Sequence, residues 1–183
     1  MTLRPGYRVQ QFLAALSLRG PVEEAVLRAY LSPAQVKLFR LIPASEQRHA
    51  FAILHTLQRE GHSEAALAQA ALLHDVGKIL PYIRQGEVGG HIRLWHRVAA
   101  VLLEAIHPAL LRRVALNEPG SWRYPFFVLL HHASYGAELA AAAGTDPLAV
   151  ALIRWHDTAP EESGLDLRGQ ALLAALRSAD EQN

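Results

Sequence analysis

The stretch Leu72-Leu73-His74-Asp75-Val76-Gly77-Lys78 puts an imidazole and a carboxylate on adjacent residues, directly after an alanine- and leucine-rich run. That run predicts a buried helix, which leaves the carboxylate of Asp75 next to apolar surroundings. An unpaired carboxylate is costly there, and a metal cation is the most economical partner for a His-Asp pair. The stretch therefore predicts a metal site.

The composition predicts one compact unit with a sizeable core, because 51% of the 183 residues are hydrophobic. The formal net charge is only +1, from 18 basic and 17 acidic side chains, which argues against a nucleic-acid or membrane partner. The chain contains no cysteine. This excludes disulfides, thiolate metal sites and a cysteine nucleophile, so any metal must be held by nitrogen and oxygen.

The sequence also carries information on cellular location. The first residues lack the apolar segment of a signal peptide. No stretch approaches the roughly 18 apolar residues that are needed to span a bilayer. We therefore expect a cytoplasmic protein without a membrane partner.

Apolar periodicity is helical along nearly the whole chain, and the sequence contains no convincing strand, so we predict an all-α fold. Ser32 and Pro33 are typical of an N-cap followed by proline in the first turn of a helix. Ser45 and Ser63 are expected to cap the next two helices. Gly61 is expected to end the first of these two helices.

Further helices are predicted on both sides of this region. Two short ones are expected near the N-terminus, over residues 9–16 and 21–30. Gly86, Gly89 and Gly90 predict a loop near the middle of the chain. The later helices are predicted over residues 92–106, 126–139, 147–156 and 167–179.

The position of His49, 25 residues before the HDVGK stretch, adds a second element to the motif, and further histidines and a late aspartate follow. This order resembles the HD-domain superfamily of metal-dependent phosphohydrolases, in which a helical bundle presents such residues to a metal. The resemblance covers about residues 45–183 and implies an HD-domain helical bundle over that range. Residues 1–44 are then a short helical extension packed on the core, with a role as a cap or a homodimer surface.

The later ligands can be aligned with this superfamily in two ways. In the first alignment, His96, His131, His132 and Asp157 correspond to the ligands of the two-metal members. This alignment uses the doublet His131-His132 and ends on Asp157. His91 is a further reserve ligand in the same part of the chain, and Asp157 is also a candidate to orient an imidazole.

The second alignment matches three consecutive helices of the superfamily, and we favour it for that reason. The matching segments are HASYGAELAAAAG (132–144), LIRWHD (152–157) and LLAALRSADEQN (172–183). The proposed ligands His132, His156 and Asp180 are then spaced by 24 residues each time. This alignment requires a long insertion after the HDVGK stretch.

The resemblance implies a role for each residue of the site. A first metal would be held by His49, His74, Asp75 and Asp180, and Asp75 would bridge to a second metal held by His132 and His156. One carboxylate can join two cations about 3.5–4 Å apart, and a water between them becomes a hydroxide nucleophile near neutral pH. Nitrogen and oxygen ligands suit one or two ions of Mn, Fe, Co, Ni or Zn, with Mg also possible.

The substrate is expected to be a small phosphorylated molecule, in particular a nucleotide. Besides Asp75, the resemblance gives Lys78 a catalytic role, and both Lys78 and Arg48 are candidates to contact a substrate phosphate. The Gly-Tyr-Pro signature of the cyclic-dinucleotide phosphodiesterases is absent after His156, which disfavours that activity. The alternative to a phosphohydrolase is a non-catalytic sensor or interaction module that binds metal or nucleotide without turnover.

Overall fold

The structure is a computed structural model that describes residues 24–80 and 92–183. Every regular element within these two ranges is a helix, so the prediction of an all-α fold is confirmed. The predicted helix over residues 9–16 and the glycine loop at residues 86–90 lie outside the described ranges. The elements are α2 (Glu24–Tyr30), α3 (Pro33–Phe39), α4 (Ala44–Arg59), α5 (Ala65–Leu73), η1 (Val76–Ile79), α7 (Leu94–Ile106), α8 (Pro108–Val114), α9 (Tyr124–Ala142), α10 (Pro147–Trp155), η2 (Pro160–Glu162) and α11 (Leu167–Gln182).

Several helix ends lie where the sequence predicts them. At the start of α3, the backbone N–H of Ser32 donates to Gln35 Oε1 (2.6 Å), and Ser32 Oγ accepts a longer hydrogen bond from the backbone N–H of Gln35. At the start of α10, Asp146 Oδ1 accepts hydrogen bonds from the first turn. Gly61 has a φ of +88° and follows the end of α4. Its freedom to adopt that φ explains why the helix ends there.

Two predicted caps are wrong by one or two residues. The N-cap of α4 is Pro43, whose ring fixes the extended entry to the helix, so Ser45 already lies inside the first turn. The N-cap of α5 is Glu64, and Ser63 belongs to the extended segment before it. The backbone N–H of Ser63 donates to the carboxylate of Glu64 (3.1 Å).

The later helices are longer or shorter than the sequence predicts. Helix α9 starts before residue 126 and continues past residue 139, while α7 begins after residue 92. Helix α11 runs through Asp180 instead of ending there. The short helix α8 is absent from the prediction. It begins at Pro108, and proline is well accepted in the first turn of a helix.

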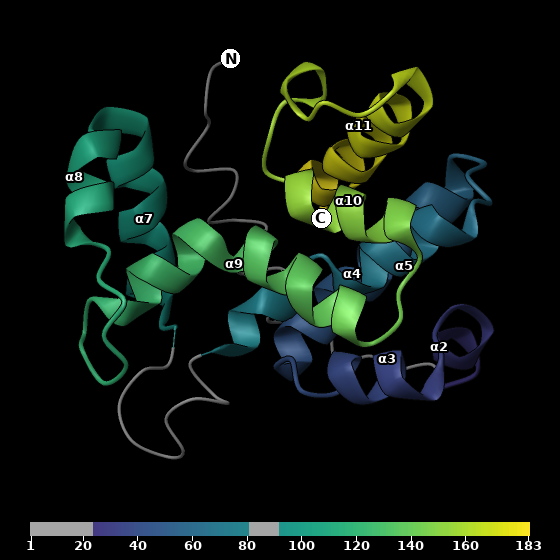
Figure 1. Ribbon diagram of the computed structural model, residues 1–183, viewed down its shortest axis with the longest axis horizontal. Coiled ribbons are helices and arrows are strands. Elements are labelled where there is room, and N and C mark those ends of the chain that lie inside the picture. The colour runs from purple at the N-terminus through teal and green to yellow at the C-terminus, as the bar shows by residue number, and fades with distance from the viewer. Residues whose placement is uncertain (1–23, 81–91) are drawn as a thin grey trace.

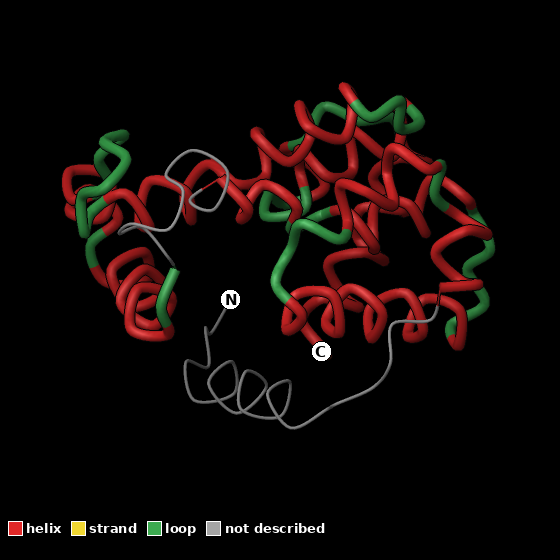
Figure 2. Tube along the Cα trace, turned by 90° about the horizontal axis from the view of Figure 1, so that it is seen from below, coloured by secondary structure: helices red, strands yellow, loops and turns green. Residues whose placement is uncertain are grey.

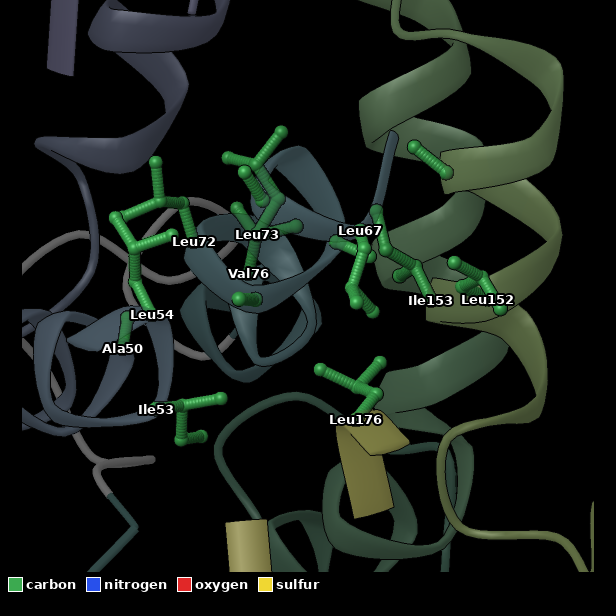
Figure 3. Packing of buried hydrophobic residues seen from close by; sticks show 14 of the residues in the cluster. Ala50, Ile53, Leu54, Leu67, Leu72, Leu73, Val76, Leu152, Ile153 and Leu176 are labelled. Carbon is green, nitrogen blue, oxygen red and sulfur yellow. The ribbon is translucent and has the colours of Figure 1, made fainter. Parts of the chain in front are cut away.

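The principal core lies where α4, α5, α10 and α11 meet. Figure 3 shows Leu73 of α5 between the side chains of α4 and those of α10, with Leu152 and Ile153 on the far side and Leu176 of α11 below. All four side chains are buried almost completely. Burial of one such side chain contributes about 2 kcal/mol. Helix α5 is thus the buried helix that the sequence predicts before the His-Asp pair.

The N-terminal helices α2 and α3 share this core. Leu27 of α2 and Phe39 of α3 are fully buried and belong to the same cluster of side chains. Gln35 of α3 is also buried, and its Nε2 donates to Thr145 Oγ1 (3.0 Å) in the turn between α9 and α10. The described part of the N-terminal extension therefore packs on the other helices.

Helix α9 links two parts of the fold. Figures 1 and 2 show α7 and α8 at one end of the molecule, with α9 crossing from them to the helices around α5. At the α7 and α8 end, Ala100, Leu111 and Phe126 form a smaller buried cluster. Trp95 and Trp122 are largely exposed on this part. None of the described helices is long and apolar enough to cross a membrane.

Candidate metal centre

The structure brings together six side chains from five separate parts of the sequence, and they are the six that the second alignment selects. They come from α4, from the ends of α5 and α10, from α9 and from α11, and they form two neighbouring groups. In each group one possible ligand atom of every member lies within 4.8 Å of the others. The first group, called here the His49 group, is His49, His74 and Asp180, and the second, the His132 group, is Asp75, His132 and His156.

The His49 group combines a close contact with an unsatisfied nitrogen. His49 Nε2 lies 2.9 Å from Asp180 Oδ1. The ring of His74 is 5.4 Å from that of His49, measured between centroids. His74 Nε2 is buried and makes no hydrogen bond within the described residues. Its nearest carboxylate oxygen is Asp75 Oδ2, at 3.4 Å, so a cation bound beside this nitrogen would have both atoms as ligands.

Three buried histidines of the two groups, His74, His132 and His156, are held in the same way. The Nδ1 of each donates to the backbone carbonyl three residues earlier in its own helix. The distances are 3.0 Å for His74 to Ala71 O, 2.9 Å for His132 to Leu129 O and 2.7 Å for His156 to Ile153 O. Because Nδ1 must carry the proton in each bond, the lone pair of the neutral ring lies on Nε2. This is the arrangement that orients histidines as metal ligands.

The His132 group brings two such lone pairs into contact. His132 Nε2 and His156 Nε2 lie only 3.2 Å apart. His132 Nε2 is also 3.3 Å from Asp75 Oδ1, and His156 Nε2 is 3.9 Å from the same oxygen. Two lone pairs and a carboxylate oxygen that converge in this way repel one another unless a proton or a cation lies between them. The donor set therefore fits a metal ion.

Asp75 lies between the two groups. Its Oδ2 is 3.4 Å from His74 Nε2, while its Oδ1 is 3.3 Å from His132 Nε2. The two oxygens of one buried carboxylate thus face different sets of nitrogens. This orientation allows Asp75 to serve both groups.

Two glycines explain how α9 comes close enough to Asp75. A Cβ added to Gly77 would lie 2.0 Å from the backbone oxygen of His132, and one added to Gly136 would lie 3.1 Å from the backbone nitrogen of Gly77. Backbone therefore packs directly on backbone where η1 meets α9. Gly136 lies one helical turn after His132, so the glycines place this histidine beside the His-Asp pair. Gly136 belongs to the segment HASYGAELAAAAG, but its contact with Gly77 cannot be predicted from the sequence.

A chain of ion pairs leads away from Asp75. Lys78 Nζ lies 2.5 Å from Asp75 Oδ2 and 3.6 Å from Glu46 Oε2. Glu46 Oε1 in turn lies 2.7 Å from Arg97 Nη2 on α7. Glu46 is another residue that the sequence analysis missed. The signal for it is the spacing of three residues before His49, which puts it on the same side of α4.

The charges in the centre shift the pKa of its members. Burial lowers the pKa of His74, but the carboxylate of Asp75 outweighs burial and raises that pKa to about 9. Burial raises the pKa of Asp75, yet the charges of Lys78 and His74 hold it well below the ordinary value. Burial lowers the pKa of His156, which favours the neutral ring. In the metal-free protein the carboxylates are therefore ionised, and His74 carries a proton.

The pKa of Asp180 is lowered in spite of burial, as is that of Asp75. Burial raises its pKa, but the hydrogen bond from His49 and the charge of His74 hold that pKa well below the ordinary value. For Lys78, burial lowers the pKa, and the carboxylates of Asp75 and Glu46 outweigh burial and raise it. The carboxylates of Asp75 and Asp180 and the amine of Lys78 are therefore charged at neutral pH.

The reserve ligands of the first alignment lie in different places. The carboxylate of Asp157 lies beside the His132 group, 3.4 Å from His132 Nε2 and 3.6 Å from His156 Nε2. Two other reserve ligands, His96 and His131, lie outside both groups. His96 accepts a hydrogen bond from the backbone of Arg93 and packs on Trp95, while His131 packs on Phe127. The remaining one, His91, lies outside the described residues.

The predicted substrate residues also have definite positions. Lys78 is engaged with two carboxylates, as described above. Arg48 precedes His49 on α4, and its Nε is buried without a hydrogen-bond partner within the described residues. A small open cleft beside the two groups adds Arg177, which the sequence alone does not indicate. The lining of this cleft is His156, Asp157, Arg177, Asp180 and Glu181.

The site can hold a metal through imidazole nitrogens and carboxylate oxygens, which are ligands that suit first-row divalent metals. Comparisons with known protein families, with curated proteins and with solved structures found no match. The donor set and its geometry therefore indicate what the site can bind.

Proposed function

We propose that the chain is a metal-dependent phosphohydrolase of the HD superfamily, acting on phosphoester or phosphoanhydride bonds of a nucleotide or another small molecule. One observation supports this most strongly. The two oxygens of Asp75 face the His49 group and the His132 group separately, at 3.4 Å from His74 Nε2 and 3.3 Å from His132 Nε2. A carboxylate placed in this way is the part that a two-metal phosphoryl-transfer site requires.

The two groups would supply the ligands of the metal ions. One ion would take its ligands from the His49 group and Asp75, and a second would take them from the His132 group. Divalent ions bound there supply Lewis acidity, which lowers the pKa of water and neutralises the phosphoryl oxygens of a substrate. Mn, Fe, Co, Ni and Zn suit these ligands, and Mg remains a candidate.

The protein contributes preorganisation. Three imidazole rings are fixed by hydrogen bonds from Nδ1 to backbone carbonyls, so their Nε2 atoms need not reorient when a ligand binds. Lys78 holds the carboxylate of Asp75 and keeps it ionised. The scheme needs no nucleophile from the protein, in agreement with a chain that contains no cysteine. The cleft beside His156 and Asp180 is lined by one member of each group, and a substrate phosphate would approach the metals from there.

The test combines metal analysis with an activity screen. The purified protein is analysed for bound metal and then assayed on phosphomonoesters, phosphodiesters and nucleotides with Mn, Co, Ni and Mg. Asp75→Asn keeps the size of the side chain and removes its charge, and the exposed Glu161→Gln serves as the matched control. We expect activity in the wild type and in Glu161→Gln, and loss of at least about a thousandfold in Asp75→Asn.

The same experiment distinguishes the runner-up. A protein that retains metal through both groups but hydrolyses none of these phosphoesters would support a non-catalytic module that binds metal or nucleotide. Activity that is unchanged in Asp75→Asn would place the chemistry elsewhere in the molecule.

A further inference from the structure

The cleft beside the metal centre opens on both ligand groups. His156 of the His132 group and Asp180 of the His49 group both line it. The other lining residues are Asp157, Glu181 and Arg177, so carboxylates dominate the opening. Arg177 is the one permanently charged cation in the lining among the described residues. An anion that enters this cleft therefore meets a single guanidinium.

The guanidinium of Arg177 is held across the cleft. Arg177 lies three residues before Asp180 on α11, which puts both side chains on the same side of that helix. Its Nη1 donates a hydrogen bond to Thr158 O, in the turn that follows α10. Its other N–H groups have no partner within the described parts of the chain. The side chain is thus positioned by one bond, and the rest of its donors are available.

The other cation near the centre is already engaged. Lys78 Nζ lies 2.5 Å from Asp75 Oδ2 and 3.6 Å from Glu46 Oε2, and the amine is largely buried. If Lys78 bound a substrate instead, it would break its ion pairs with the buried carboxylates of Asp75 and Glu46. The loss of these ion pairs costs free energy. A phosphate group in the cleft therefore needs a different cation.

We propose that Arg177 binds the phosphate group of the substrate by two parallel hydrogen bonds to its non-bridging oxygens. This inference rests on the proposed phosphohydrolase function and adds the residue that selects an anionic substrate. The planar guanidinium presents paired N–H groups whose geometry matches a phosphate, whereas an ammonium is a point charge. Because the carboxylate of Asp157 repels an anion at the same opening, binding of phosphate depends strongly on Arg177.

Inorganic phosphate is the probe that tests this inference without turnover. It is titrated by calorimetry into the full-length protein carrying its bound metal, with Arg177→Gln, Arg177→Lys and Arg168→Gln compared with the wild type. Arg168 is exposed on the same helix and does not line the cleft, so its variant controls for the loss of one charge. We expect Arg177→Gln to weaken phosphate binding at least about tenfold, Arg177→Lys to be intermediate and Arg168→Gln to match the wild type.

Metal content and circular dichroism establish that each variant is folded and loaded. If Arg177→Gln fails to fold, the comparison of Arg177→Lys with Arg168→Gln carries the test, and equal affinities overturn the inference. Equal affinities of Arg177→Gln and Arg168→Gln overturn it as well, and so does a wild type that binds no phosphate. Phosphate binding that depends on Arg177 in a protein without any phosphoesterase activity would overturn the proposed function and support the inference.

Discussion

His132 Nε2 and His156 Nε2 face each other at 3.2 Å, while the Nδ1 of each ring donates to a backbone carbonyl of its own helix. Both rings therefore direct a lone pair at the same point, and Asp75 Oδ1 lies beside that point. A metal-free protein keeps this arrangement at an electrostatic cost. Binding of a cation should remove this repulsion and raise the free energy of unfolding.

Removal of one of these rings should change the metal stoichiometry. In His156→Ala the His132 group loses a ligand, so we expect the metal content per chain to fall by about one ion while the His49 group stays loaded. The exposed His55→Ala is the control, because it removes an imidazole from α4 outside both groups. Elemental analysis of the purified proteins measures the number of metal ions per chain. The same number in His156→Ala and His55→Ala would contradict the assignment.

Metal binding should release a proton from His74. The pKa of His74 is raised to about 9 in the metal-free protein, so the ring is protonated at pH 7 and must lose that proton to bind a cation. Apparent metal affinity should therefore rise with pH, by up to about tenfold per unit, until the pH approaches that pKa. Calorimetry at pH 7 in buffers with different enthalpies of ionisation counts the released protons. Binding without proton release would contradict this assignment.

Gly77→Ala should destabilise the protein and weaken metal binding together. A Cβ at this position would lie 2.0 Å from the backbone oxygen of His132, so η1 and α9 must separate. We expect a loss of about 2–4 kcal/mol in the free energy of unfolding and a reduced metal content. Gly136→Ala should cost less, since its nearest contact, the backbone nitrogen of Gly77, is 3.1 Å away. Denaturant unfolding of both variants checks this order, and the reverse order would count against direct backbone packing.

Lys78→Ala should lower the free energy of unfolding, while Lys37→Ala should leave it nearly unchanged. Lys78 compensates the buried carboxylates of Asp75 and Glu46, and its removal is expected to cost the metal-free protein about 3 kcal/mol. Lys37 is exposed on α3 and provides a matched loss of one amine. With metal bound, Lys78→Ala should keep its metal and lose activity. Loss of the metal in Lys78→Ala would contradict this prediction and show that Lys78 is needed for metal binding.

The sequence was sufficient for the features that are encoded locally. The N-cap at Ser32 and the stop at Gly61 are short-range signals, and the structure confirms both. The choice of His132, His156 and Asp180 depended on a resemblance, and the structure brings these three residues together with the His-Asp pair. Their role as metal ligands stays a prediction.

The parts that the sequence did not predict depend on tertiary contacts. Nothing in local periodicity indicates that Gly136 contacts Gly77, because this contact forms only when α9 packs on η1. Glu46 looks like a solvated acid in the first turn of a helix, yet it is buried against Lys78 and Arg97. Arg177 is one of many arginines in the sequence, and only the packing of α11 beside α10 puts it in the cleft.

The positions of the bound metal ions decide whether Asp75 joins two metal sites. Crystals of the metal-loaded protein, with anomalous scattering recorded on both sides of the metal absorption edge, locate each ion without any assay. The account predicts two peaks, one on each side of the Asp75 carboxylate, with His49, His74 and Asp180 around the first and His132 and His156 around the second. A loaded crystal without an anomalous peak at coordination distance from Asp75 would contradict it.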